Sequence, residues 1–203
     1  NLDIYPGWVV GDRLSVDLLA TREKTWQGSA SYSLPLGVDG WRLQTQLART
    51  DYQLGKEFAA LGAHGTADIA QLSLSYPLLR TSQTNIRASM GVQHRALKDM
   101  RDAAARSARK RADVAQLSLN ADWLEPNAVT WGGLSLNAGK LHLNAAEQQI
   151  DSTTARTAGR YNRVNLDAVR LQALTGSWNV YARVAAQWAN KNLDASEKMV
   201  LGG

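Results

Sequence analysis

The chain of 203 residues contains no cysteine, a single phenylalanine and only three histidines. Without cysteine, a disulfide framework, a thiol nucleophile and thiolate metal ligands are excluded. The sequence also lacks any run approaching the ~18 consecutive apolar residues of a transmembrane helix, which excludes a helical membrane protein. A membrane β-barrel stays possible, because the strands of such a barrel are apolar on one face only.

Apolar and polar residues alternate with a period of two through most of the chain, which is typical of strands with one apolar face. In WNVYARVAAQW (178–188), one phase holds tryptophan, valine and alanine, whereas the other has Arg183 at its midpoint. This alternation predicts nine strands, at residues 12–21, 26–34, 41–48, 68–77, 85–95, 113–123, 133–143, 163–171 and 178–188. Strands in soluble sheets are shorter, with about five or six residues on average. After Ala138 the alternation slips, which predicts a β-bulge.

The connections between these stretches alternate in length. Short connections rich in Gly, Pro, Asn, Asp or Ser lie at residues 35–40, 78–83, 125–130 and 175–176. The second set, mostly long, lies at residues 21–25, 55–67, 98–110 and 144–157. We expect loops in the second set, with a polar loop at 145–159 and a solvated loop tip at the basic run RDAAARSARKR (101–111). That run could also form a short helix or bind nucleic acid or lipopolysaccharide phosphate, but no aromatic residues are interleaved with it.

These patterns predict an all-β fold, namely an antiparallel up-and-down transmembrane β-barrel that is incomplete, with about nine strands in an open curved sheet. Aromatic side chains near the strand ends would form membrane-interface belts. These aromatics are Trp26, Trp41, Tyr76, Trp123, Trp131, Trp178 and Trp188. Tyr52 and Tyr161 depart from the pattern because they fall off the apolar phase. The alternative is a soluble β-sandwich or solenoid, whose core would be expected to hold more Ile and Phe.

The polar phase is the predicted pore lining. Amides and charges of both signs would keep a conduit wet, although they could equally solvate or plug a barrel. The predicted pore-lining residues are Gln27, Ser29, Ser31, Arg42, Gln44, Gln46, Arg87, Gln93, Gln116, Asn120, Asp122, Asn137, Asn165, Asp167, Arg183 and Gln187.

Catalytic chemistry has little support in the sequence. His64, His94 and His142 lie on separate segments, which argues against a metal site or a catalytic triad. Neither a GxSxG, a P-loop nor an HExxH motif occurs, and the carboxylates lack paired spacing. We therefore expect no enzymatic activity, no cofactor, no metal and no catalytic residue. An outer-membrane lipase is a less favoured alternative, because it would need a serine, a histidine and a carboxylate or amide gathered on the outer wall.

Three segments carry a resemblance to a known family. They are residues 28–80, which include SYSLPLGVDGWRLQTQLARTDYQLG, residues 156–174 (RTAGRYNRVNLDAVRLQAL), and residues 190–203 (NKNLDASEKMVLGG). Together they resemble the barrel of the two-partner-secretion transporters, the haemolysin activation/secretion (TpsB) proteins. The resemblance covers essentially the whole chain.

The resemblance implies a sixteen-stranded barrel in the outer membrane of a Gram-negative bacterium, which exports a large secreted TpsA-type exoprotein of the haemolysin or adhesin class (type V secretion). Residues 1–203 would be a partial barrel domain, roughly family strands 3–11, with residues 1–12 at a periplasmic turn. The POTRA domains, plug helix and closing strands of the family are absent from this sequence. Outer-membrane lipid would be the other partner, nucleic acid would not be one, and the full-length protein would be monomeric.

The resemblance also points to a long loop that folds back into the barrel. Its start would comprise Ser196, Glu197, Lys198, Leu201, Gly202 and Gly203. Glu197 and Lys198 could pair with the barrel wall there. Two rivals stay open: an assembly factor of the same superfamily, which inserts other barrels, and a soluble β-rich adhesin module. A neighbouring gene for a secreted adhesin or haemolysin would favour export.

Overall fold

The computed structural model describes residues 2–21, 25–53, 62–101, 106–174, 176 and 178–199. Within these ranges, ten strands form one antiparallel sheet in which every strand pairs with its neighbours in the sequence. The strands are β1 (Leu2–Ile4), β2 (Arg13–Ala20), β3 (Trp26–Leu36), β4 (Trp41–Gln53), β5 (Ala63–Arg80), β6 (Thr84–Arg101), β7 (Arg106–Glu125), β8 (Ala128–Leu143), β9 (Gly159–Ala173) and β10 (Asn179–Ala189). The described helices are α1 (Ala145–Thr153) and the 3₁₀ turn η3 (Ala195–Glu197), and neither has the length and apolarity needed to cross a membrane.

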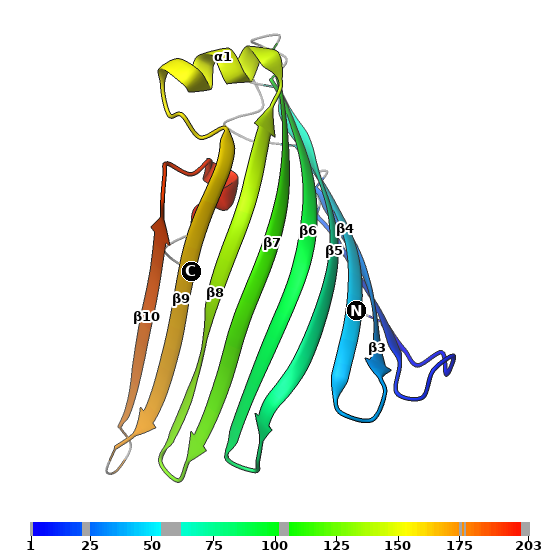
Figure 1. Ribbon diagram of the computed structural model, residues 1–203, viewed down its shortest axis with the longest axis vertical. Coiled ribbons are helices and arrows are strands. Elements are labelled where there is room, and N and C mark those ends of the chain that lie inside the picture. Colours follow the sequence, from blue (N-terminus) through cyan, green and yellow to red (C-terminus); the bar gives the residue numbers. More distant parts are fainter. Residues whose placement is uncertain are drawn as a thin grey trace.

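The sheet curves around but does not close, and β10 forms one of its edges (Figure 1). This confirms the predicted fold class, an open up-and-down meander. The structure adds one strand, because Leu2–Ile4 pairs with residues 14–16 of β2 where the sequence predicted a turn. The turn itself begins after Ile4 and ends before Arg13.

The strand register sorts the side chains onto two faces. We call the face on which residues 191–199 pack the inner face, and the opposite one the outer face. In β7 and β8, for example, Gln116 lies opposite Asn137 on the inner face, and Leu117 lies opposite Leu136 on the outer face. By this register, all of the predicted pore-lining residues belong to the inner face.

The predicted β-bulge in β8 is wrong. The register of β8 is continuous with both β7 and β9 along the strand. The alternation changes because Leu141 and Leu143 face inward and join an apolar cluster on the inner face. The apparent slip therefore reports a change in what covers the inner face and not a change in the backbone.

Several strands extend further than their alternation suggested. β5 begins at Ala63, β6 continues to Arg101 and β7 begins at Arg106. The predicted extent of the loop at 101–111 is therefore wrong, because Arg101 ends β6 and residues 106–111 belong to β7. Residues 102–105, where the loop tip was predicted, lie outside the described ranges. Small and polar residues break the alternation in these extensions, as Lys98 and Asp99 do on opposite faces of β6, so that the sequence does not mark the strand ends there.

The predicted polar loop at 145–159 is also wrong, since most of it is helix α1. Alanine, glutamate and glutamine favour a helix over this stretch. The carboxylate of Asp151 then accepts hydrogen bonds from the backbone N–H groups of Thr157 and Ala158, both at 2.9 Å, and fixes the return of the chain into β9.

The aromatic residues divide between the two faces. Six of the seven predicted belt residues follow the outer phase, and the rings of Trp41 and Tyr76 lie 4.7 Å apart on that face. Trp131 instead follows the inner phase, opposite Asp122 in β7, so its predicted face is wrong. Trp131 shares its phase with Gly133, Ser135 and Asn137 of β8. The prediction was based on its being a tryptophan near a strand end, which does not determine the face.

Candidate functional site

The segment from Lys191 to Met199 leaves β10 and lies against the inner face of the sheet near the end that carries α1 (Figure 1, in red). Its first residues are fixed to the connection between α1 and β9. Lys191 Nζ donates to the carbonyl oxygen of Ala158 at 2.6 Å, and Asn192 Nδ2 donates to that of Ala155 at 3.0 Å. We call Lys191–Met199 the inner segment.

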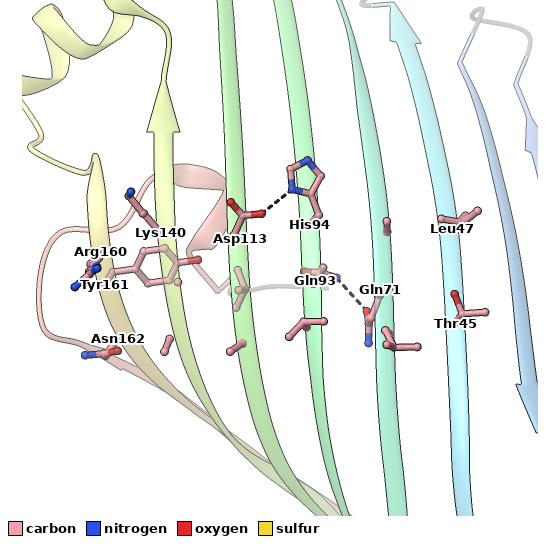
Figure 2. Close-up of a pocket in the computed structure, with 17 residues that line it drawn as sticks. Thr45, Leu47, Gln71, Gln93, His94, Asp113, Lys140, Arg160, Tyr161 and Asn162 are labelled. Carbon is pink, nitrogen blue, oxygen red and sulfur yellow. Dashed lines mark hydrogen bonds and ion pairs between the residues drawn. The ribbon is translucent and has the colours of Figure 1, made fainter. Parts of the chain in front are cut away.

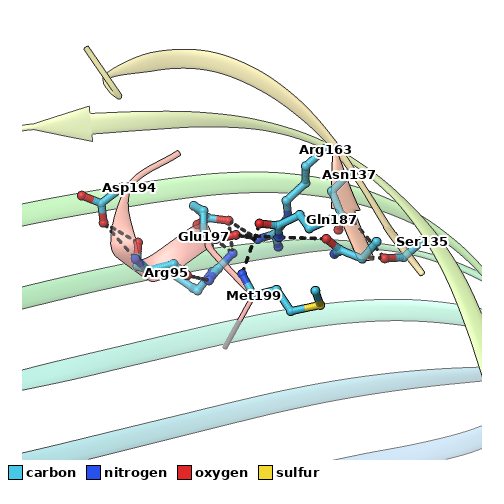
Figure 3. A network of polar contacts seen from close by, with 10 residues as sticks. Arg95, Ser135, Asn137, Arg163, Gln187, Asp194, Glu197 and Met199 are labelled. Atoms are coloured by element: carbon cyan, nitrogen blue, oxygen red, sulfur yellow. Dashed lines mark hydrogen bonds and ion pairs between the residues drawn. The ribbon is translucent and has the colours of Figure 1, made fainter. Parts of the chain in front are cut away.

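A buried carboxylate anchors the inner segment to two arginines of the sheet. The side chain of Glu197 is 1% exposed and lies between Arg95 of β6 and Arg163 of β9 (Figure 3). Arg95 Nη2 is 2.8 Å from Glu197 Oε1, and Arg163 Nη1 is 3.0 Å from Oε2. Arg163 also donates to the backbone carbonyl of Glu197, and Arg95 donates to that of Ser196 at 3.2 Å. One acidic side chain thus joins two strands that are three places apart in the sheet.

A second ion pair lies one turn earlier in the inner segment. Asp194 Oδ2 is 2.7 Å from Lys110 Nζ of β7, and Asp194 Oδ1 accepts hydrogen bonds from the N–H and the hydroxyl of Ser196. Burial alone would raise the pKa of the Asp194 carboxyl, but hydrogen bonds from Lys110 and Ser196 hold that pKa below its ordinary value. Asp194 is therefore ionised at neutral pH and caps η3.

An apolar cluster supports the inner segment between these ion pairs. Leu193 is 7% exposed and packs with Ala112, Val114, Leu141 and Tyr161, which are all buried. Burial of a leucine side chain contributes about 1.5–3 kcal/mol, so this cluster stabilises the docked position. The inner face is apolar at the place where the segment covers it, whereas amides such as Gln46, Gln71 and Gln93 line it on β4 to β6.

Tyr161 fits this cluster because its strand partner is a glycine. Gly139 of β8 lies opposite Tyr161, and a Cβ at Gly139 would fall 2.3 Å from Tyr161 Cζ. Tyr52 lies opposite Gly65 in the same way, and the Tyr52 hydroxyl donates to Asp99 Oδ1 at 2.5 Å. Tyr52 and Tyr161, which the sequence placed off the apolar phase, therefore both lie across an inner-face glycine.

Gln187, the last inward polar residue of β10, connects the segment to the polar ladder of the sheet. Its Nε2 donates to the carbonyl oxygen of Glu197 at 3.1 Å and to Asn165 Oδ1 at 2.8 Å, and its Oε1 accepts from the N–H of Met199 at 3.2 Å (Figure 3). Further along, Arg183 pairs with Asp167 at 2.9 Å. Predicted pore-lining residues thus contact one another across neighbouring strands.

A model of the family described as haemolysin secretion/activation protein ShlB/FhaC/HecB matches residues 11–203 of this sheet and its inner segment. The chain belongs to this family. Among curated proteins, the heme/hemopexin transporter protein HuxB of Haemophilus influenzae strain Rd is 24% identical over 201 residues, covering 97% of this chain and 35% of HuxB. HuxB of strain 86-028NP matches with the same identity and coverage.

Among solved structures, CdiB from Acinetobacter baumannii has a similar fold, with a TM-score of 0.64, 18% identity, and coverage of 99% of this chain and 37% of CdiB. The family predicted from the sequence is therefore confirmed. The chain spans about a third of the length of the relatives it matches.

The predicted start of the inward loop in this family member is described only in part. Ser196 and Glu197 contact the inner face as given above, whereas Lys198 is exposed. Leu201, Gly202 and Gly203 lie outside the described residues. Sequence reasoning missed Arg95 and Arg163, because neither residue differs from other arginines of the inner phase. The signals that could have located the site were the off-phase Tyr161 and the slip of alternation in β8.

The histidines do not converge in the described part of this family member. They lie on β5, β6 and β8, and no group of three or more His, Asp or Glu residues in the described ranges could hold a metal ion. His94 forms a pair with Asp113 on the outer face, with 2.7 Å between Nδ1 and Oδ1 (Figure 2).

Proposed function

We propose that this chain forms part of the wall of an outer-membrane pore in a Gram-negative bacterium, through which a large secreted exoprotein of the haemolysin or adhesin class leaves the cell by two-partner secretion. The observation that carries the proposal is a single sheet with an apolar outer face and a polar inner face in a chain of this family. The export activity belongs to the whole protein, which we propose is a monomer that needs no cofactor and catalyses no reaction.

The outer face supports a lipid environment. Large apolar side chains are exposed along the sheet, including Leu72 of β5 (47%), Leu117 of β7 (53%) and Val184 of β10 (60%). An exposed apolar surface that spans a whole sheet requires a covering, because soluble proteins rarely leave patches of more than a few hundred Å² open to water. Acyl chains supply that covering in a membrane barrel.

Charged pairs at both ends limit this apolar band. Arg49 and Asp68 lie 3.3 Å apart at the end of the sheet that carries α1. At the other end, Arg170 and Glu125 lie 2.6 Å apart. Charged groups are costly in the middle of a bilayer and are favourable at its two surfaces, so this distribution fits a sheet that crosses the membrane with its strands.

The inner face supports a conduit for an unfolded chain. Amides and charges of both signs follow one another across β3 to β10, and some of the charged residues are paired, as Arg183 is with Asp167. Such a wall is wet and offers no large apolar surface on which a sliding polypeptide would stick. We propose passive conduction, driven by folding of the exoprotein outside the cell.

The inner segment is the proposed gate of this conduit. Its contacts reach from β6 to β10, through Arg95, Lys110, Arg163 and Gln187. A segment held on the conduit wall by three ion pairs and one apolar cluster occupies space that an exported chain would need. Its docking would therefore shape or restrict the pore.

Cysteine crosslinking of an exoprotein halted in transit tests the proposal. The chain has no cysteine, so single replacements in the full-length transporter give an unambiguous background for this region. Gln116→Cys and Asn120→Cys on the inner face should crosslink to the halted exoprotein, whereas Leu117→Cys and Leu119→Cys on the same strand should not. Equal crosslinking on both faces, or none on the inner face, would reject an export route along this wall.

A further inference from the structure

A cluster of basic side chains, four of them arginine or lysine, lies on the outer face next to the apolar band. Arg109 and Arg111 of β7, Lys140 and His142 of β8, and Arg160 of β9 all follow the outer phase and are exposed. Arg111 lies directly opposite His142, and Lys140 lies directly opposite Arg160. We call these five residues the basic patch.

The charge of the basic patch is poorly balanced by the protein. Lys140 and Arg160 carry like charges directly opposite each other on neighbouring strands, an arrangement that destabilises a sheet. In the described ranges, no ion pair joins any of the five side chains to a carboxylate; Asp113 of β7 lies directly opposite Lys140, but this single carboxylate, with Oδ1 2.7 Å from His94 Nδ1, leaves the patch with an excess of positive charge. An anion bound from outside would remove this repulsion, because phosphate forms charge-assisted hydrogen bonds with arginine and lysine.

A groove of about 860 Å³ leads from the basic patch into the apolar band (Figure 2). Lys140 and Arg160 lie at its polar edge together with His94 and Asp113, and Figure 2 shows the two cations on adjoining strands. Its apolar lining comes from Leu47, Ala70, Leu72, Val92, Ala115 and Ala138. The small alanine side chains form the floor of the groove, and the leucine and valine side chains border it. The groove is therefore an apolar path that begins at Lys140 and Arg160.

We propose that the basic patch and this groove bind a phosphorylated, multiply acylated glycolipid of the outer leaflet, of the lipid A type, with its phosphate on Lys140 and Arg160 and an acyl chain in the groove. The inference rests on the proposed function in one respect, that the outer face lies in the outer membrane. The patch is at the end that carries α1 and the longer connections, which in barrels of this kind is the cell-surface end.

The charge of the patch decides between the lipids available there. A phosphomonoester carries about −1.5 to −2 charges at neutral pH and can neutralise two cations. A zwitterionic phospholipid brings its own ammonium group and leaves the repulsion within the patch in place. The chemistry of the patch therefore selects the phosphorylated glycolipid.

The test is native mass spectrometry of the full-length transporter in detergent, with bisphosphorylated lipid A and phosphatidylethanolamine as separate probes. We expect the wild-type protein to retain lipid A and to lose it at least about tenfold more readily after Lys140→Gln and Arg160→Gln together, since two charge-assisted hydrogen bonds are lost. Arg170→Gln is the matched control, because Arg170 shares a strand and a face with Arg160 but lies at the other end. This control should bind lipid A as the wild type does.

Folding of each variant is checked by its heat-modifiable migration in gels, and Arg109→Gln with Arg111→Gln serves as a second neutralised pair. Retention of lipid A by both folded double variants, or equal retention of phosphatidylethanolamine by the wild type, would overturn the proposal. The binding readout does not depend on export. A transporter that binds lipid A but fails the crosslinking test above would therefore refute the proposed function alone.

Discussion

Glu197 and Arg95 are 102 residues apart in the chain, yet their side chains meet at 2.8 Å on the inner face of the sheet. Arg163 contacts the same carboxylate from the other side, and all three side chains are largely buried. Removal of one partner from a buried ion pair leaves an uncompensated charge, which typically costs about 3–5 kcal/mol. The docked position of the inner segment therefore depends on this one carboxylate.

Glu197→Gln should release the inner segment, because two guanidinium groups then face each other without an anion. We expect hydrogen–deuterium exchange of residues 191–199 to speed up by more than about tenfold, as a loss of more than ~1.4 kcal/mol requires. Lys198→Gln is the control, since Lys198 is exposed, and it should leave exchange unchanged. Unchanged exchange in the Glu197 variant would show that the apolar cluster alone holds the segment.

Charge reversal of Glu197 and Arg95 should not restore docking as it would for an isolated ion pair, because Arg163 shares the same carboxylate. Exchange of Glu197 and Arg95 (Glu197→Arg with Arg95→Glu) leaves Arg163 facing the new arginine. We expect this double variant to restore docking only after Arg163→Gln is added, because that substitution removes the like charge. Full protection in the double variant without the third change would contradict the shared-carboxylate geometry.

Gly139→Ala should displace Tyr161, because the new Cβ would fall 2.3 Å from Tyr161 Cζ. The expected cost is about 1–3 kcal/mol of unfolding free energy, as for other overpacked sites. Gly133→Ala on the same strand and face is the matched control, since its Cβ would meet only the movable Oδ1 of Asn120 at 2.6 Å. Urea unfolding of the two variants in lipid vesicles compares them, and an equal effect would count against the close packing of Tyr161 on Gly139.

The Asp194–Lys110 pair predicts a dependence on pH. The pKa of Asp194 lies below its ordinary value of 3.8, so its contribution is complete at higher pH and is lost as the pH falls below about 4 towards the lowered pKa. Spin labels at positions 198 and 89 should report a constant distance from pH 7 to 5 and a longer one near pH 3. In the Asp194→Asn variant, the distance between the labels should change less between pH 5 and pH 3 than in the wild type. Release already complete at pH 5 would exclude Asp194 as its origin.

The face of β7 on which an arginine is placed should decide how strongly it destabilises the folded protein. Leu117→Arg places a charge on the outer face near the middle of the apolar band, and we expect it to destabilise the folded barrel by about 2–4 kcal/mol. Ser118→Arg, the next residue, places the same charge on the inner face and should cost much less. Urea unfolding of the full-length protein in vesicles measures both, and similar losses would argue against a membrane on the outer side.

The sequence predicted the meander and the two faces because each strand is apolar on one side only, and this period survives in a single sequence. The prediction failed where a strand is not apolar on one side only. Leu141 and Leu143 are inward and apolar because the inner segment covers them, so their strand seemed to contain a bulge. Beyond the band, as in residues 106–111, both faces are polar, and alternation no longer marks the strand.

The anchor of the inner segment could not be predicted for a different reason. The contact of Glu197 with Arg95 and Arg163 depends on how far the chain turns back after β10, which no local pattern encodes. The resemblance to the family indicated an inward loop near Ser196, but the partners on the sheet became visible only when the register placed both arginines on one face.

The most direct test of the account is the accessibility of spin labels along β7 in the full-length protein in lipid vesicles. Labels at Ala115, Leu117 and Leu119 should collide with oxygen dissolved in the acyl chains, whereas labels at Gln116, Ser118 and Asn120 should collide with a water-soluble nickel complex. This residue-by-residue alternation is the result that an outer face in lipid and a wet inner face predict. Protection of Leu117 and its outer-face neighbours from both reagents would mean that protein covers them, and it would contradict the account.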